Sequence, residues 1–221
     1  MRRCFIFCHG FGFDKNFWNN LIPFFKEDSY ISLDLGYFGN SERLPSIDYN
    51  TILIGVGHSL GFVKLLELEE RLSCLIGLNA FLNFLGNNLN LRKKRYQELE
   101  SMRNSFLKYP CLTLKRFYKR CQGPNQVESL AKLRKERLEK DFSSFFRTFY
   151  IKRDIPVLLL GSKDDPIVST QVIEDNFVCY DNVDIQLLDQ GKHALGFLEA
   201  TEVYKRIRSF LHAIYQTKNS K

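Results

Sequence analysis

The stretch ILIGVGHSLGF (residues 52–62) runs from an apolar strand pattern directly into the sequence GHSLG (57–61). The apolar run predicts a strand that is buried on both faces, and the residues after it have helical spacing. A serine between two glycines at such a junction has two interpretations. Ser59 is either part of a tight turn or a nucleophile whose hydroxyl is exposed at the end of the strand.

Similar apolar runs recur along the chain and alternate with segments of helical spacing. The predicted strands are 4–8, 30–35, 51–56, 74–79, 155–161 and 183–188. The predicted helices are 16–26, 61–72, 170–179 and 200–215. This alternation predicts a doubly wound α/β fold with a mostly parallel sheet.

The interval 84–150 departs from this alternation. It is rich in Arg, Lys, Glu and Phe and contains no clear strand. We expect several helices here, inserted into a core formed by residues 1–83 and 151–221. A helical insertion at the carboxyl ends of the strands is where a lid over an active site would lie. We call residues 84–150 the lid segment.

The composition is that of a single globular domain, because 44 % of the 221 residues are hydrophobic and 14 % are aromatic. The net charge of +7 is unevenly distributed. Residues 91–140 contain 15 basic and 5 acidic residues, net +10, whereas the remainder has 17 and 20, net −3. This basic segment is either a site for an acidic partner or a solvated helical face. It matches no nucleic-acid recognition motif, so we expect no nucleic-acid partner.

Several other classes have no support in the sequence. No stretch reaches the roughly 18 apolar residues of a membrane helix, and the apolar run after the N-terminal MRR is too short for a signal peptide. The six cysteines lack metal-ligand spacing, and there is no Walker motif or GxGxxG. We therefore expect a reduced, cytoplasmic protein without a metal or cofactor, and without a membrane partner.

A serine nucleophile needs a base, and the chain offers four histidines. His193, in DQGKHALGF (189–197), follows the last predicted strand in a glycine-flanked loop, which is the position expected for the base. His9 ends the first predicted strand. His58 is interpreted as a packing residue that points away from the serine, and His212 as a partly buried helix residue.

The base in turn needs an orienting carboxylate. The stretch LLLGSKDDPIVS (158–169) places two candidates, Asp164 and Asp165, after a strongly apolar strand. We favour Asp165, because choosing Asp164 would put the following proline in a position that is usually apolar. The other aspartate is then a solvent-facing turn residue. The resulting chain order, Ser59, Asp165, His193, is the order of the α/β-hydrolase triad.

A further motif follows the first predicted strand. HGFG (9–12) is either a simple glycine turn or part of an oxyanion hole. In the second interpretation, the backbone N–H groups of Phe11 and Leu60 stabilise the oxyanion of the transition state.

Taken together, these motifs resemble the α/β-hydrolase superfamily. The resemblance rests on HG at 9–10, DLGYFGNS at 34–41, GHSLG at 57–61, GSKDDPIV at 161–168 and GKHALGF at 191–197. It implies an α/β-hydrolase fold with a helical lid and a serine esterase activity. Members usually have a β-hairpin before the HG strand, which here starts at residue 3, so we expect about six strands instead of eight.

The lid segment carries a narrower resemblance. LTLKRFYKRCQGPN (112–125) and SLAKLRKERL (129–138) are similar to the lid of the pimeloyl-[acyl-carrier protein] methyl ester esterases of biotin synthesis. The substrate contacts that this resemblance implies, together with the two oxyanion residues, are Phe11, Leu60, Phe117, Tyr118, Lys119, Arg120 and Cys121. The implied contacts to the acidic carrier protein are Arg116, Arg120, Lys132 and Arg134.

The resulting hypothesis is a monomeric serine carboxylesterase that hydrolyses the methyl ester of pimeloyl-[acyl-carrier protein], with the carrier protein as its partner. Two alternatives remain open at this point. In the first, the chain is a thioesterase or small-ester hydrolase of broad specificity. In the second, it is a non-catalytic binding protein that keeps the hydrolase fold.

Overall fold

The computed structural model describes residues 2–124, 126–152 and 154–219. A six-stranded sheet with the order β2-β1-β3-β4-β5-β6 forms the centre of the molecule, and all neighbouring strands are parallel. The strands are β1 (Arg3–Cys8), β2 (Ser29–Leu33), β3 (Ile52–His58), β4 (Cys74–Leu78), β5 (Val157–Ser162) and β6 (Val183–Leu188). The predicted parallel sheet of about six strands is confirmed.

Burial differs between the central and the edge strands. Nearly all residues of β1, β3, β4 and β5 are buried, as their continuous apolar runs predict. The edge strands β2 and β6 are mostly half-buried, and each has one exposed position. The central strands therefore form the hydrophobic core, and their carboxyl ends provide a rigid support for the loops that follow.

Two helices on one face of the sheet are shorter than predicted. The segment predicted as a helix over 61–72 forms α1 (Leu60–Leu66) followed by a 3₁₀ turn, η3 (Glu69–Arg71). The second helix is α5 (Thr170–Phe177). Phe62 of α1 and Phe177 of α5 lie with ring centroids 5.8 Å apart, so both helices cover the same face.

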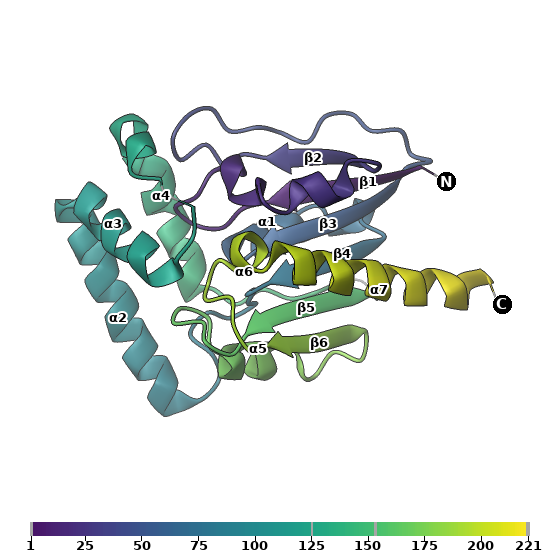
Figure 1. Cartoon of the computed structure of the whole chain (residues 1–221). Coiled ribbons are helices and arrows are strands. Elements are labelled where there is room, and N and C mark those ends of the chain that lie inside the picture. Colours follow the sequence, from purple (N-terminus) through teal and green to yellow (C-terminus); the bar gives the residue numbers. More distant parts are fainter. Residues whose placement is uncertain (1, 125, 153, 220–221) are drawn as a thin grey trace.

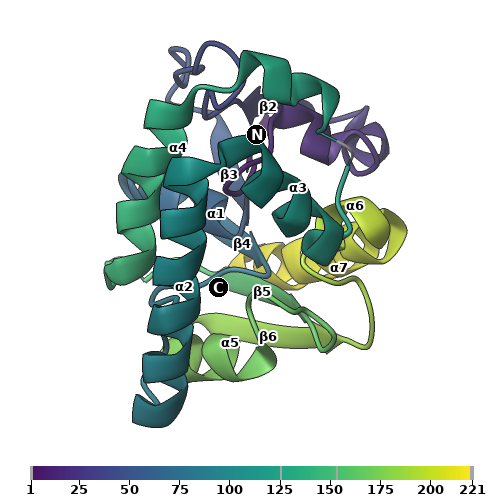
Figure 2. The same ribbon diagram turned by 90° about the vertical axis from the view of Figure 1, so that its left-hand side faces the viewer.

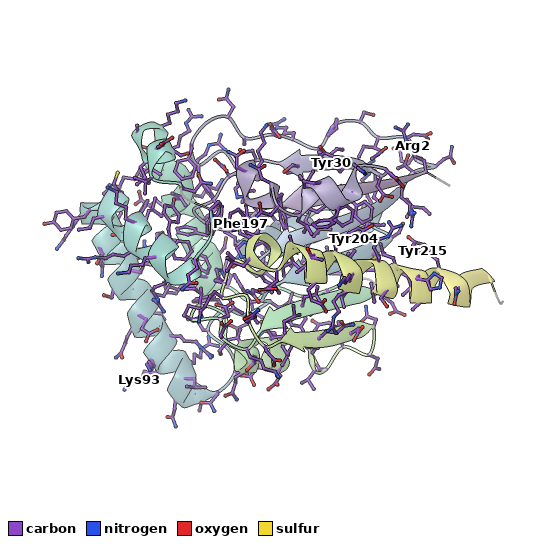
Figure 3. All side chains as sticks on the ribbon, in the orientation of Figure 1. Arg2, Tyr30, Lys93, Phe197, Tyr204 and Tyr215 are labelled. Atoms are coloured by element: carbon purple, nitrogen blue, oxygen red, sulfur yellow. The ribbon has the colours of Figure 1, made fainter. Side chains whose placement is uncertain are left out.

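The opposite face is covered by α7 (Ala200–Asn219), which runs across the front of the sheet in Figure 1. Tyr204 of α7, labelled in Figure 3, packs with its ring centroid 5.2 Å from those of Phe24 and Phe25. With helices on both faces, the sheet is doubly wound, as predicted.

The prediction of a helix over residues 16–26 is wrong. This segment forms two short 3₁₀ helices, η1 (Lys15–Trp18) and η2 (Ile22–Phe25). Pro23 has no backbone N–H and cannot donate the hydrogen bond that a continuous α-helix needs there. In the structure it lies in the first turn of η2, where no such bond is required.

The lid segment lies beyond the carboxyl ends of the strands, at the left in Figure 1 and toward the viewer in Figure 2. Its elements are α2 (Leu89–Lys108), α3 (Pro110–Cys121), η4 (Glu128–Lys132), α4 (Lys135–Phe142) and η5 (Ser143–Phe146). We call residues 1–83 and 151–221 the sheet domain. An isolated antiparallel bridge joins Asn83 to Thr148, close to where the chain leaves and re-enters this domain.

A half-buried polar cluster attaches α4 to the sheet domain. Asp141 of α4 accepts hydrogen bonds from Lys64 Nζ on α1 and from the hydroxyl of Tyr37, both at 2.6 Å. Burial raises the pKa of Tyr37 well above its usual value, so the hydroxyl keeps the proton that it donates. The interaction connects the lid segment directly to the helix that follows Ser59.

We expect Asp141→Asn to lower the free energy of unfolding by about 1–3 kcal/mol, because it removes the charge opposite Lys64 at a site that is mostly shielded from water. Denaturant unfolding followed by circular dichroism measures this. Glu139→Gln, an exposed position on the same helix, is the matched control and should change the value by less than about 0.5 kcal/mol. Equal effects of the two variants would contradict the proposed role of the cluster.

Candidate active site

Ser59 lies at the junction between β3 and α1 in a strained conformation. Its backbone has φ +50° and ψ −119°, a region that residues other than glycine rarely adopt. A Cβ at Gly61 would clash with the carbonyl oxygens of Cys8 and His9, so only glycine lets the start of α1 approach β1 this closely. The junction therefore has the geometry of a nucleophile elbow.

His193 and Asp165 form a buried pair in the loops that follow β6 and β5. His193 Nδ1 lies 2.8 Å from Asp165 Oδ2, and both residues are nearly inaccessible to water. The other carboxylate oxygen accepts the backbone N–H groups of Ile167 and Val168 at 2.7 and 3.1 Å. These bonds orient the carboxylate toward the ring, and they leave Nε2 of His193 as the nitrogen that can accept a proton.

The neighbouring acid, Asp164, has a different role. Its Oδ1 accepts hydrogen bonds from the Ser162 hydroxyl and the Lys192 backbone N–H, and its Oδ2 forms an ion pair with Lys192 Nζ at 3.0 Å. Asp164 thus connects the two loops, whereas Asp165 contacts the histidine ring. Of the two candidates that the sequence offers, the structure joins Asp165 to His193.

Two side chains hold the backbone of His193. His58 Nε2–H donates to the His193 carbonyl at 2.8 Å, and Asn79 Nδ2 donates to the same carbonyl at 3.0 Å and to that of Lys192 at 2.6 Å. Asn79 also accepts the backbone N–H of Ser162 at 2.8 Å. The loop that carries His193 is therefore fixed to the ends of β3, β4 and β5.

The protonation state of His58 suits this role. Burial, with a smaller effect of the nearby His193, lowers the pKa of His58 well below its usual value, so the ring is neutral. Its ring stacks on Phe17 with centroids 4.2 Å apart. The sequence predicted only a packing role for His58, and it missed Asn79 altogether. The signal that could have found Asn79 is a polar residue directly after the buried strand β4.

Both ring nitrogens of His9 form hydrogen bonds with nearby backbone groups. Nε2 accepts the Leu35 backbone N–H at 3.0 Å, so Nδ1 carries the proton and donates to the Gly10 carbonyl at 3.0 Å. The ring fixes the loop that contains Phe11. Leu60 is the first residue of α1, so its backbone N–H has no acceptor within the helix. The oxyanion roles of Phe11 and Leu60 remain predictions.

Ser59, Asp165 and His193 line one cavity of about 720 Å³. Its apolar wall contains the aromatic rings of Phe11, Phe84, Phe117, Phe142 and Phe145. The ring centroids of Phe142 and Phe145 lie 4.8 and 5.4 Å from that of Phe11. The α2 and α3 helices add Arg95, Arg116 and Arg120 to the wall. The cavity can therefore hold an apolar chain and a polar group together.

The residues implied by the lid resemblance occupy different places. Phe117, Arg116 and Arg120 line the cavity, whereas the exposed Lys119 and the buried Tyr118 and Cys121 are not among its lining residues in the described part of the chain. The hydroxyl of Tyr118 donates to the Gly12 carbonyl at 2.7 Å, and the Cys121 carbonyl accepts the Ala194 N–H at 3.2 Å. Both residues therefore attach α3 to the loops of the site.

The other two residues predicted to contact a carrier, Lys132 and Arg134, are exposed on the lid segment and lie outside the cavity wall. Arg134 donates from its side chain to the Gly39 carbonyl at 3.1 Å and from its backbone to that of Tyr37 at 2.7 Å. Its guanidinium thus already donates one hydrogen bond to the sheet domain.

The described residues contain neither a candidate metal site nor a helix that could span a membrane. No group of three or more His, Cys, Asp or Glu side chains there could hold a metal ion. None of the helices in that part of the chain combines the length and apolar character needed to cross a bilayer.

No family model and no curated protein sequence matches the chain. Solved structures match it over nearly its whole length. An esterase from Exiguobacterium antarcticum has a TM-score of 0.73 at 13 % identity, covering 95 % of this chain and 92 % of that chain. An epoxide hydrolase from Bacillus megaterium has a TM-score of 0.71 at 15 % identity, and the match covers 96 % of this chain and 94 % of that chain. MenH from S. aureus has a TM-score of 0.70 at 16 % identity, and the match covers 96 % of this chain and 94 % of that chain.

At these low identities the comparisons show the fold alone. The chain has the α/β-hydrolase fold, as predicted from the order of its motifs, and the similarity extends across the lid segment as well as the sheet domain.

We expect Asp165→Asn to slow the covalent labelling of Ser59 by a fluorophosphonate probe by about 10³-fold or more. The amide oxygen would keep the backbone N–H groups of Ile167 and Val168, so the NH₂ group would face His193 Nδ1 and favour the wrong tautomer. Asp164→Asn is the matched control, and its effect should stay below about tenfold, since it disturbs only the connection between the loops. Labelling rates measured by mass spectrometry test this. A larger effect of the Asp164 variant would reverse the assignment of the acid.

Proposed function

We propose that this chain is a serine ester hydrolase whose catalytic residues are Ser59, Asp165 and His193. One observation carries the proposal. A serine on a strained elbow opens into the same cavity as a histidine whose Nδ1 is paired at 2.8 Å with a buried carboxylate. The likeness in fold to proteins named as esterases and hydrolases supports it.

The mechanism follows from these positions. His193 Nε2 takes the hydroxyl proton of Ser59 as its Oγ attacks the ester carbonyl carbon, and Asp165 stabilises the imidazolium that forms. The backbone N–H groups of Phe11 and Leu60 donate to the oxyanion. His193 then gives the proton to the departing alcohol. A water molecule repeats the sequence on the acyl-enzyme and releases the carboxylic acid.

Within this class, the substrate that we propose is the methyl ester of pimeloyl-[acyl-carrier protein], which releases methanol and the free pimeloyl carboxylate in the cytoplasm as a step of biotin synthesis. The resemblance of residues 112–138 to the lid of those esterases supports this choice. So does the net charge of +10 over residues 91–140, because an acidic carrier would be attracted to it. The aromatic wall suits an acyl chain.

Ser59→Ala should abolish hydrolysis of methyl esters, with a loss of at least about 10³-fold in kcat, because the attacking oxygen is removed. Methanol release measures the activity, and circular dichroism checks that the fold is retained. Ser209→Ala, an exposed serine on α7, is the matched control. Hydrolysis retained by the Ser59 variant would refute the nucleophile. A wild-type chain that is inactive on every ester and unlabelled by fluorophosphonate would favour the non-catalytic alternative.

Carrier recognition makes a separate prediction. The double variant Arg116→Glu, Lys132→Glu should lower kcat/KM for methyl pimeloyl-carrier by about tenfold or more at low salt, because charge reversal slows association with an acidic partner. The double variant Lys26→Glu, Lys205→Glu changes the net charge equally at exposed positions of the sheet domain and is the control. Equal effects of the two doubles would contradict carrier docking. Faster cleavage of a matched thioester than of the methyl ester would favour the thioesterase alternative.

A further inference from the structure

The wall of the cavity is divided into two chemically different parts. The aromatic rings gather around Phe11, as their centroid distances show. Two of the three arginines instead contact the loop that follows Asp165. Arg120 donates to the Pro166 carbonyl at 2.8 Å, and Arg95 donates to the Ser169 hydroxyl at 2.8 Å. The positive charge therefore lies beside the loop that holds the candidate catalytic acid.

Arg95 is built into this wall. It is half-buried, and besides Ser169 it donates from Nη1 to the Leu85 carbonyl at 3.3 Å. Gly86 makes room for it, because a Cβ there would lie 2.7 Å from Arg95 Nη1. Both of its hydrogen-bond partners are neutral, so the hydrogen bonds orient the guanidinium without neutralising its charge.

The other two arginines extend the positive region along α3. Arg116 and Arg120 are four residues apart on this helix, so their side chains lie on one face and repel each other. In the described part of the chain, none of the three arginines has an acid within ion-pair distance. Glu98, which also lines the cavity, and Asp175 attract Arg95 only from farther away.

We propose that Arg95, Arg116 and Arg120 form an anion subsite of the cavity, which binds a carboxylate or phosphate group carried by the ester substrate. A guanidinium presents paired N–H donors that match the oxygens of either group. The cavity lining contains two acids, Glu98 and Asp165, and Asp165 is already paired with His193, so the three arginines leave this part of the wall with excess positive charge. The inference rests on the proposed ester hydrolysis and narrows its substrates to anionic esters whose apolar portion contacts the aromatic wall.

Matched esters test the subsite. Monomethyl adipate carries a carboxylate, methyl 6-phosphonooxyhexanoate carries a phosphate, and methyl hexanoate of the same chain length is neutral. We expect the wild-type kcat/KM for at least one anionic ester to exceed that for methyl hexanoate by about tenfold, and Arg95→Gln to remove most of that preference. Comparison of the two anionic esters shows whether the carboxylate or the phosphate is recognised. Arg103→Gln, on the same helix but outside the cavity wall, is the control and should keep the preference.

Binding separates this inference from the proposed function. Calorimetry on Ser59→Ala measures binding of the two anionic esters and of methyl hexanoate without turnover, and Ser59→Ala, Arg95→Gln should bind whichever anionic ester is recognised about tenfold more weakly. If the wild type hydrolyses no ester but this difference is found, the proposed function fails and the subsite stands. Equal binding of the neutral and both anionic esters, or equal effects of the Arg95 and Arg103 variants, would overturn the subsite.

Discussion

The parallel alignment of the strands is the constraint on which the site depends, because it brings all the strand ends to one edge of the sheet. Cys8 of β1 pairs with Gly57 of β3, and Gly57 pairs with Gly77 of β4. The residues that follow these three positions therefore emerge side by side. They include the loop with Phe11, the elbow with Ser59 and the loop that begins at Asn79. Loops after β5 and β6 supply the acid and the histidine at the same edge.

Hydrogen bonds between buried neutral groups then set the position of the histidine. The His193 carbonyl accepts from His58 and from Asn79, which belong to two different strand ends. A shift of this loop would leave buried donors without acceptors, at a cost of about 1–3 kcal/mol for each. Because burial keeps His58 neutral, the ring donates from Nε2 across the whole physiological pH range. The arrangement positions the imidazole through its backbone, while Asp165 positions it through its ring.

The sequence predicted the central strands well because each of them is a compact apolar run that a local pattern is enough to reveal. The prediction of a helix over residues 16–26 failed because the apolar residues there have helical spacing, but Pro23 cannot donate the hydrogen bond that a continuous helix needs. The sequence could favour Asp165 over Asp164 only through the loop pattern, since both acids follow the same strand. The roles of Asn79 and Tyr118 depend on contacts between segments far apart in the chain, with Lys192 and Gly12, and no local pattern contains that information.

The lid segment divides into two parts with different connections to the sheet domain. Its second part is held by Asp141, next to Phe142 in the aromatic wall, so changes there would disturb the helix after Ser59 as well as the cavity. Its first part, α2 and α3, contributes the arginines and is attached to the loops of the site by hydrogen bonds from Arg95, Tyr118 and Arg120. We therefore expect that substitutions on the cavity side of α2 and α3 would change which ester the proposed site accepts, while the strand ends that carry the candidate catalytic residues stay in place. In the proposed function, the residues assigned to selectivity and those assigned to the reaction thus lie on different segments of the chain.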